Sequence, residues 1–417
     1  MARTKKSKKQ KLANQQAKET EDSIITNIEE DFIALDEEDK RSRQEKRFEI
    51  KSGNKRKREE EEEDEETSDF ESFTEDEKYV YPWVERLQSV TLPKNPTVSA
   101  FFQKEIVAFV QYLEPSRAEV RMREFLIHRV EQVIKRLSPR SKVDDSDIDI
   151  VVNPPVGERL QLRKIARALE KYDICDNTTV IDRATVPVIK FEDALTELKV
   201  DIIVDSTTGL ASAEIIKTMI RQQPGLRQLT LIIKHFLALR KLNEVFSGGL
   251  GGYAIVCLVL SFLQMHPKVA SGEIDPEKNL GPLLIEFFHL YGINFELGRI
   301  GICVRNRGSY FDADYDNDIG CKSYSAVSVC QHFRKAYLTL TSHASALAEQ
   351  VERQSKKGKD VRDCFSKTSL LKHIIHIPVN MISQRDLIEE CYLQRRWLDE
   401  FAADSFSWTA EELGKSK

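Results

Sequence analysis

Two aspartates, Asp147 and Asp149, alternate with isoleucines in the run SDIDIVV at residues 146–152. Alternate residues of a β-strand project from one face, so the pattern predicts a strand that carries both carboxylates on the same side. Two like charges on one apolar strand repel each other, and a divalent cation between them would relieve that repulsion. Carboxylate oxygens are ligands that Mg²⁺ prefers, often together with substrate phosphates. A solvated strand end is the alternative, which this short motif alone does not exclude.

A third carboxylate follows on a neighbouring predicted strand. A helix over about 159–171 and a strand candidate at 186–191, VPVIKF, precede it. The segment 200–205 reads VDIIVD, so Asp201 and Asp205 share one strand face. The other face carries Val200, Ile202 and Val204. Three strand-borne carboxylates suit a two-metal site, in which a hydroxyl attacks the α-phosphate of a nucleotide in line. The sequence therefore predicts metal-dependent phosphoryl transfer.

Helical periodicity surrounds this strand-rich region on both sides. Residues 97–137 predict two amphipathic helices that break at Glu114-Pro115-Ser116, where Pro and Ser favour a helix start. From Gly225 to about Tyr337 the pattern is again helical. We expect the two helical regions to form one domain that the carboxylate-bearing segment interrupts.

The first 78 residues differ in composition from the rest of the chain. Residues 1–19 are rich in lysine, Lys55–Arg58 reads KRKR, and eight acids follow at 59–66. Blocks of like charge repel and bury little apolar surface, so we expect disorder. The basic clusters are candidates for nuclear localisation signals or RNA-attracting arms, and a merely solubilising tail is the alternative.

Cysteine usage and hydropathy exclude several classes. The seven cysteines show no CxxC pair, which favours reduced thiols of an intracellular protein. His373 and His376 form an HxxH motif but lack partner ligands for zinc. No apolar run approaches the roughly 20 residues that span a bilayer, and no secretory signal opens the chain, so we expect no membrane association.

A long ordered set of motifs supports a resemblance to a known family. From about Tyr81 to about Tyr337 the chain carries SDIDIVV, VPVIKF, VDIIVDSTTGL, PGLRQLTLIIKHFLALRKLNEVFSGGLGGYAIVCLVLSFLQMHP and DPEKNLGPLLIEFFHLYGINF. These resemble the noncanonical poly(A) polymerases of the Trf type, in the DNA polymerase beta-like nucleotidyltransferase superfamily. The resemblance implies an α+β fold, in which a small mixed-sheet nucleotidyltransferase (palm) domain is inserted in an all-helical central domain.

The resemblance also implies a division into domains, behind the disordered N-terminal tail. The expected parts are a disordered charged tail at 1–78, helices of the central domain at 97–137, the nucleotidyltransferase domain at 138–224, the helical central and PAP-associated domain at 225–340, and a partly ordered, charged helical tail at 341–417.

By resemblance, Asp147, Asp149 and Asp201 form the catalytic, metal-binding triad. The implied metal is Mg²⁺ or Mn²⁺, and ATP is the implied substrate. Asp205 would be a structural neighbour of the third ligand.

Five further residues match positions that the family uses around the nucleotide. The resemblance implies that Lys234 contacts the triphosphate, although a lysine in an apolar helix also snorkels to the surface. It places Gly209 under the nucleotide, and Gly252 with Tyr253 at a helix N-terminus, where the aromatic ring stacks on the base. A buried core tyrosine is the alternative. Asn317 matches an asparagine near adenine.

The chain departs from this family at three places. The family carries a Gly-Ser pair shortly before the Asp-x-Asp strand, whereas this chain has no glycine between Gly53 and Gly157. The stretch between Asp312 and Asp316 is short, and Cys321 stands where the family has arginine. Either these loops have diverged or two segments are missing from this sequence.

The leading hypothesis is a template-independent RNA adenylyltransferase that adds short oligo(A) tails to RNA 3′ ends. The resemblance implies nuclear RNA surveillance, with a zinc-knuckle RNA-binding protein and an RNA helicase as partners in a TRAMP-type complex that feeds the nuclear exosome. The nucleus is the expected compartment, and the nucleolus is a second candidate. A pseudoenzyme scaffold and a terminal uridylyltransferase are the alternatives.

Overall fold

The computed structural model describes residues 81–88, 92–146, 149–155, 161–182, 187–204, 207–297, 299–312, 323–366 and 368–394. The expected disordered tail at 1–78 lies outside the described residues. The same holds for four residues that the sequence singled out: Asp147, Asp205, Asn317 and Cys321.

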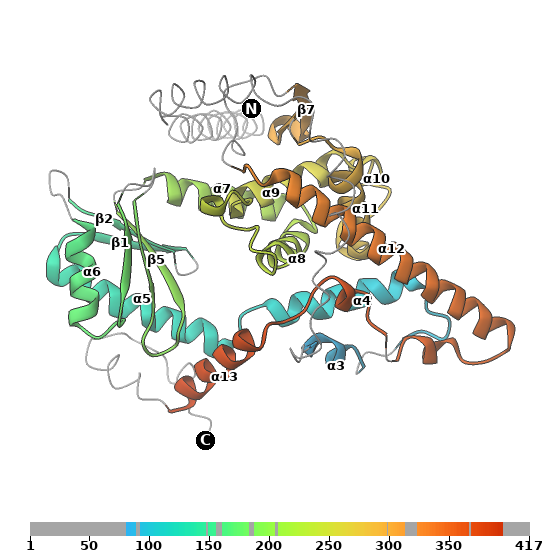
Figure 1. Cartoon of the computed structure of the whole chain (residues 1–417), viewed down its shortest axis with the longest axis horizontal. Coiled ribbons are helices and arrows are strands. Elements are labelled where there is room, and N and C mark those ends of the chain that lie inside the picture. The colour runs from blue at the N-terminus through green and yellow to red at the C-terminus, as the bar shows by residue number, and fades with distance from the viewer. Residues whose placement is uncertain are drawn as a thin grey trace, which may run out of the picture. The chain divides into compact units, whose positions relative to one another are not determined.

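Five strands form a mixed sheet in the order β1-β2-β5-β4-β3 (Figure 1). The strands are β1 (Lys142–Ser146), β2 (Asp149–Asn153), β3 (Thr178–Ile181), β4 (Val188–Glu192) and β5 (Lys199–Val204). β2 and β5 run parallel, and every other neighbouring pair is antiparallel. The strands predicted at 186–191 and 200–205 are confirmed as β4 and β5, each within two residues of its predicted ends.

One face of this sheet packs against two helices, α5 (Arg117–Leu137) and α6 (Leu162–Lys171) (Figure 1). Alternate strand residues, such as Ile150 and Ile202, are fully buried with apolar residues of both helices in one cluster, here called the sheet cluster. Strand alternation therefore places the intervening residues of β2 and β5 on the other face of the sheet.

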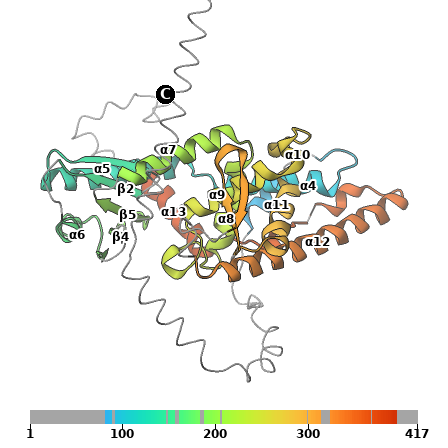
Figure 2. The same ribbon diagram turned by 90° about the horizontal axis from the view of Figure 1, so that it is seen from above.

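A second apolar cluster, the helical cluster, joins helices from distant parts of the chain (Figure 2). Its main helices are α3 (Pro82–Gln88), α4 (Val98–Leu113), α8 (Leu226–Ala238), α9 (Gly252–Met265), α11 (Leu280–His289) and α12 (Ala326–Lys356). The short helix α10 (Pro267–Ala270) follows α9, and the hairpin of β6 (Ile300–Cys303) with β7 (Ser309–Asp312) contacts α9 through β6. Helix α7 (Thr207–Gln222) contacts both α9 and β1.

The predicted break between the first two long helices is confirmed. Ser116 caps α5: its hydroxyl accepts from the Glu119 backbone N–H at 3.1 Å, and the Glu119 carboxylate accepts from the Ser116 N–H at 2.6 Å. However, the two helices serve different cores. α4 packs in the helical cluster, whereas the buried residues of α5 from Met122 to Ile134 belong to the sheet cluster. The domain boundaries themselves stay predictions.

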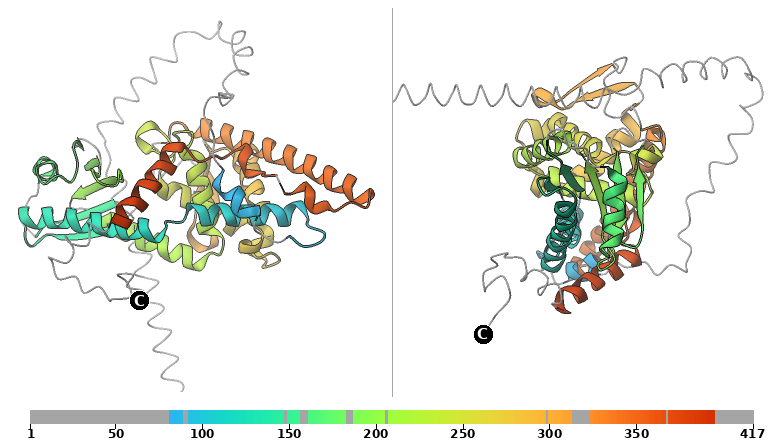
Figure 3. Two further views of the ribbon diagram at one scale, coloured as in Figure 1. Left: turned by 90° about the horizontal axis from the view of Figure 1, so that it is seen from below. Right: turned by 90° about the vertical axis from the view of Figure 1, so that its left-hand side faces the viewer.

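The described part of the expected tail, residues 341–366 and 368–394, forms regular elements. Helix α12 runs 31 residues, through the boundary expected at 340 and 341. The segment 370–377 follows, and Leu371 and Ile377 within it are fully buried. Helix α13 (Val379–Gln394) then lies against α5 (Figure 3). Residues 370–394 therefore contact both the helical cluster and the sheet cluster.

Two general features concern membranes and thiols. Within the described ranges, no helix combines the length and the apolar character that a membrane span requires. The described cysteines all carry free thiols: Cys175, Cys257, Cys303, Cys330, Cys364 and Cys391.

Candidate functional site

The run at residues 146–152 does not form one continuous strand. β1 ends at Ser146 and β2 begins at Asp149, and these two residues face each other in the antiparallel pair. The prediction that residues 146–152 form one continuous strand is therefore wrong. Without β1, strand β2 would lie at the sheet edge with unpaired backbone groups, and pairing of the preceding segment satisfies them. Asp147 lies between the strands and outside the described residues, so its role as a ligand stays a prediction.

Parallel pairing of β2 with β5 aligns Asp149 with Asp201. Their Cα atoms are register partners, and neighbouring strands lie about 4.8 Å apart. Val200 and Ile202 are buried in the sheet cluster, so the Asp201 side chain lies on the opposite face. A carboxylate such as that of Asp201 is a ligand type that suits a hard divalent cation. No group of three metal-binding side chains converges among the described residues, so the predicted triad is not tested.

Lys190 already pairs with the candidate ligand Asp201. It stands opposite Asp201 in the antiparallel β4–β5 pair, and its ammonium forms an ion pair with the Asp201 carboxylate. The Asp201 position therefore attracts a cation, as a metal ligand should. Sequence reasoning did not single out Lys190. The available signal was a lone charge at an alternate position of the apolar run VPVIKF.

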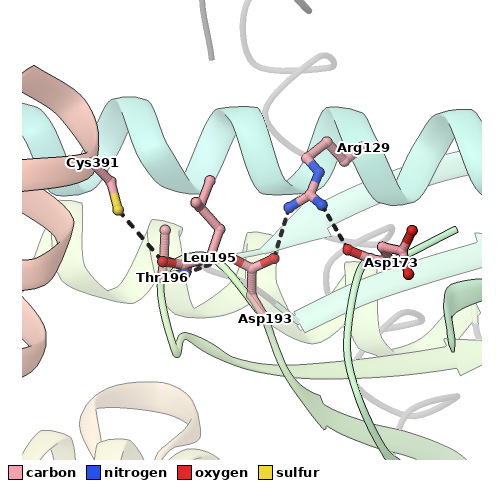
Figure 4. Close-up of polar contacts among 6 residues, drawn as sticks. All are labelled: Arg129, Asp173, Asp193, Leu195, Thr196 and Cys391. Carbon is pink, nitrogen blue, oxygen red and sulfur yellow. Dashed lines mark hydrogen bonds and ion pairs between the residues drawn. The ribbon is translucent and has the colours of Figure 1, made fainter. Parts of the chain in front are cut away.

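An ion pair between Arg129 of α5 and the buried carboxylate of Asp193 fixes the turn between β4 and β5 (Figure 4). Arg129 Nη1 lies 3.0 Å from Asp193 Oδ1, and Arg129 Nη2 donates to the Asp173 carbonyl at 3.0 Å. The other Asp193 oxygen accepts from the backbone N–H and hydroxyl of Thr196, at 2.9 and 2.6 Å. A carboxylate that is 1% exposed requires such partners. The turn that aligns β4 with β5 is thereby locked to α5.

Helix α13 contacts the same turn. The Cys391 thiol donates to the Leu195 carbonyl at 3.5 Å, and Gln384 Nε2 donates to the Glu197 carbonyl. Burial raises the pKa of Cys391, with further contributions from Glu390 and Asp193, so the thiol stays protonated and able to donate at neutral pH. The strands that carry Lys190 and Asp201 are thus held by two helices distant in sequence.

Lys234 lies on the exposed side of α8. Its neighbours Ile233 and Phe236 are buried in the helical cluster, while the Lys234 ammonium reaches solvent. Next to it, His235 Nε2 lies 2.9 Å from the His376 carbonyl, and burial lowers the pKa of His235. Lys234 is therefore not a buried charge. Its predicted contact with a triphosphate stays a prediction.

The glycines around the start of α9 have different structural roles. Gly248 has φ +81°, a conformation that side chains other than glycine rarely adopt, and a Cβ on Gly249 would lie 2.4 Å from the Leu242 carbonyl oxygen. Both are required by the fold. Gly252, the first residue of α9, is different, because an added Cβ would meet no atom within 4 Å. The open space beside Gly252 leaves room for a ligand at a helix N-terminus.

Tyr253 follows in the first turn of α9 and is half-buried. Burial raises the pKa of the Cys257 thiol, one turn later, to about 12, and the neighbouring Tyr253 side chain opposes that rise. Stacking on a base is a role that nothing in the described contacts tests.

Gly209 lies in the first turn of α7, beyond the end of the strand that carries Asp201. β5 ends at Val204, three residues or about 10 Å past Asp201. The described contacts do not bring Gly209 together with the aligned aspartates.

Two serines occupy the region where the resembling family has its Gly-Ser pair. Ser138 and Ser141 are buried, and their hydroxyl groups have no hydrogen-bond partner in the described part of the chain. They precede Lys142, which pairs with Asn153 at the end of the hairpin away from Asp149. Four strand residues span about 13 Å, so these serines do not replace the Gly-Ser pair beside the aligned aspartates.

Two family models match the chain. Residues 102–221 match a model described as the central palm domain of mitochondrial-like poly(A) RNA polymerase, and residues 279–318 match one described as Cid1 family poly A polymerase. The first match contains β2, β4 and β5.

Several curated relatives are similar in sequence. Poly(A) RNA polymerase CID14 of Cryptococcus neoformans is 33% identical over 354 residues, which cover 76% of this chain and 46% of the relative. Poly(A) RNA polymerase protein 2 of Saccharomyces cerevisiae is 39% identical over 230 residues, covering 52% of this chain and 39% of the relative. The chain thus spans less than half the length of these relatives. A Drosophila melanogaster protein, named inactive non-canonical poly(A) RNA polymerase Trf4-2, is 30% identical, covering 62% of this chain and 72% of that protein.

A solved structure of the polymerase core of TRAMP, described as an RNA surveillance complex, is similar in fold. It has 30% sequence identity and a TM-score of 0.62, covering 71% of this chain and 99% of that one. The predicted fold class, a mixed-sheet palm combined with a helical domain, is therefore confirmed. Together with the Drosophila relative, this match shows that the chain belongs to the non-canonical poly(A) RNA polymerase family.

Proposed function

We propose that this chain is a template-independent RNA adenylyltransferase, which adds short oligo(A) tails to RNA 3′ ends. The observation that carries the proposal is the register of Asp149 with Asp201 across the parallel strands β2 and β5. Curated relatives named poly(A) RNA polymerases support ATP as the donor and RNA as the acceptor.

In the proposed reaction, the RNA 3′-oxygen attacks the α-phosphorus of ATP. The bond from that phosphorus to the bridging oxygen breaks, pyrophosphate leaves, and the hydroxyl proton passes to solvent. Divalent cations, Mg²⁺ or Mn²⁺, would when bound lower the pKa of the 3′-hydroxyl and neutralise charge on the leaving group. Asp147, Asp149 and Asp201 are the residues that would hold them.

The remaining predicted site residues would bind and orient the nucleotide. The exposed ammonium of Lys234 would pair with the triphosphate, and the Tyr253 ring would stack on the base. The open space at Gly252 would let the N-terminus of α9 approach the ligand. Gly209 and Asn317 would complete the adenosine pocket.

The proposal extends to a cellular setting. The similarity to the TRAMP polymerase core supports a role in nuclear RNA surveillance, upstream of exosome decay. A zinc-knuckle RNA-binding protein and an RNA helicase would then deliver the substrate. The basic clusters before residue 60 would direct the protein to the nucleus, including the nucleolus.

Primer extension by the purified chain tests the proposal. A labelled RNA primer is incubated with each nucleoside triphosphate separately, in Mg²⁺ and in Mn²⁺. We expect a ladder with ATP, and its loss in Asp201→Asn at an unchanged thermal midpoint. Glu192→Gln, which removes an exposed carboxylate from β4, is the matched control and should extend normally. Preference for UTP would instead make the chain a uridylyltransferase.

A catalytically silent scaffold is the second candidate function. The Drosophila relative that this chain covers to 72% is named inactive, and this chain lacks the Gly-Ser pair expected before β2. Under this alternative the helical cluster would serve to dock partners. No extension with any nucleotide in either metal, by protein with a cooperative thermal transition, would favour the scaffold.

A further inference from the structure

Three charged positions form one row across adjacent strands. Lys190 on β4 is the register partner of Asp201 on β5, which is in turn the register partner of Asp149 on β2. The neighbours of Lys190 along β4, Ile189 and Phe191, are buried in the sheet cluster. The Lys190 ammonium therefore lies on the same face of the sheet as the Asp201 carboxylate.

The ion pair between Lys190 and Asp201 is of a kind that is readily exchanged. The Lys190 side chain is 44% exposed and the Asp201 side chain 31%. Pairs with this exposure contribute little to stability, because water screens both charges and the long lysine loses side-chain freedom. A divalent cation carries twice the charge of an ammonium and binds carboxylate oxygens at shorter distances. Such a cation can therefore take the place of Lys190 at Asp201.

We propose that Lys190 is a built-in counter-cation, which occupies Asp201 in the metal-free protein and is displaced when a divalent cation binds. The inference rests on the proposed function, since it assigns Asp201 as a metal ligand. Lys190 would thus act as a positioning residue. It neutralises one carboxylate of the aligned pair while the site is metal-free, and it sets how much divalent cation the site needs.

If Lys190 and the metal compete for Asp201, removing Lys190 changes the metal affinity in a definite direction. Removing the ammonium should tighten divalent-cation binding, because the metal no longer has to displace it. An exposed pair of this kind corresponds to a change of about two- to five-fold in a binding constant. Simple loss of a required ligand would have the opposite sign. A purely structural role would change thermal stability and leave the binding constant unchanged.

The strand pair offers a matched control. Lys199 on β5 stands opposite Glu192 on β4, with Nζ 3.8 Å from a carboxylate oxygen. It is a second cross-strand pair on the same two strands, outside the described register of β5 with β2. Lys199→Met therefore removes the same charge from the same sheet while leaving the proposed competition intact.

Mn²⁺ binding to the full chain, without RNA or nucleotide, tests the inference by electron paramagnetic resonance of free Mn²⁺. We expect Lys190→Met and Lys190→Gln to lower the half-saturating Mn²⁺ concentration about two- to five-fold. Lys190→Arg and Lys199→Met should stay close to the unmodified chain. Thermal midpoints, measured on the same samples, identify any variant that does not fold.

The outcomes separate this inference from the function on which it rests. Unchanged or weaker Mn²⁺ binding in both neutral Lys190 variants would overturn the competition. An equal gain in Lys199→Met would also overturn it, since general electrostatics would then be the cause. Mn²⁺ binding that persists in Asp201→Asn would remove Asp201 from the metal site and would count against the proposed function as well.

Discussion

The position of Asp201 within its strand indicates what its carboxylate can bind. Val200 and Ile202 fill the sheet cluster on either side of Asp201, so the carboxylate is the one group of that strand segment held toward the other face. A carboxylate on that face of the sheet gains no stabilisation from apolar packing. Its partner in the structure is a cation, Lys190, which agrees with a site built to hold positive charge.

Tyr253 offers a prediction at the same scale. Tyr253→Ala should weaken apparent ATP affinity by about 1–3 kcal/mol, because a base loses its stacking surface. The quantity to measure is the ATP concentration that half-saturates primer extension. Tyr253→Phe is the control: it keeps the ring and removes only the hydroxyl near Cys257. If the phenylalanine variant lost as much affinity as the alanine variant, the hydroxyl and not the ring would be the relevant group.

Among elements, the turn from β4 to β5 depends on one buried charge pair. Arg129→Met should lower the free energy of unfolding by about 3–5 kcal/mol, because Asp193 is left buried without its cation. Urea denaturation at neutral pH measures this loss. The control is Arg163→Met, whose pair with Asp182 joins side chains that are 73% and 45% exposed. It should cost no more than about 1 kcal/mol. Comparable losses in the two variants would contradict a special role for the turn.

The contact between α12 and the segment after it predicts a dependence on pH. The rings of His343 and His373 stack with centroids 3.5 Å apart, and burial, with His343 and Lys372, lowers the pKa of His373 to about 4. The unfolded chain binds its proton near pH 6.5, so stability is full above that pH and is lost as the pH falls toward 4.

His373 is partly exposed, so the expected loss between pH 7.5 and pH 5 is only about 1 kcal/mol. Urea denaturation of the unmodified chain and of His373→Asn at both pH values measures it. The asparagine variant should show a smaller difference between the two pH values. An identical pH dependence in both proteins would assign the effect to other groups.

Local sequence patterns predicted helices and strands better than they predicted which of these elements pack or pair together. The apolar stripe with Phe125, Val130 and Ile134 predicted α5, yet the same stripe fits any apolar surface, and only the folded chain assigns it to the sheet cluster. Val120, an apolar residue on the same helix, is 39% exposed. The break in the run at residues 146–152 was missed because strand register depends on a pairing partner. Lys190 was missed for the same reason, since its importance appears only opposite Asp201.

At the scale of the molecule, a buried carboxylate joins three distant segments. Glu105 on α4 accepts from Trp83 Nε1 at 3.2 Å and from the Leu370 backbone N–H at 2.9 Å, together with the Ser369 hydroxyl. Burial raises the pKa of Glu105, and these hydrogen bonds oppose that rise. Sequence periodicity gave no sign of this contact, because Ser369 and Leu370 are 264 and 265 residues from Glu105 in the chain. It explains why residues after 340 pack as part of the helical cluster.

The segment before β2 leads to a prediction about the reaction rate of the whole protein. Only two residues separate Ser146 from Asp149, and the buried serines Ser138 and Ser141 lie at the far end of the hairpin. The backbone donors that a Gly-Ser turn would offer to the triphosphate are therefore not supplied by these residues. Charge-assisted hydrogen bonds of that kind contribute about 1.5–3 kcal/mol each. Loss of two would slow the reaction about 10²- to 10⁴-fold.

Inserting the Gly-Ser segment of a relative, such as poly(A) RNA polymerase protein 2 of Saccharomyces cerevisiae, between Leu137 and Asp145 should therefore accelerate tailing by that factor. Single-turnover primer extension with ATP measures the rate, and a Gly-Ser→Ala-Ala version of the insert is the control. The control separates phosphate binding from a general gain in folding, because both inserts extend the hairpin equally. Equal rates for the original chain and the Gly-Ser insert would mean that donors elsewhere in this chain already hold the triphosphate, and that the shortened connection is a functional variant of the family's site.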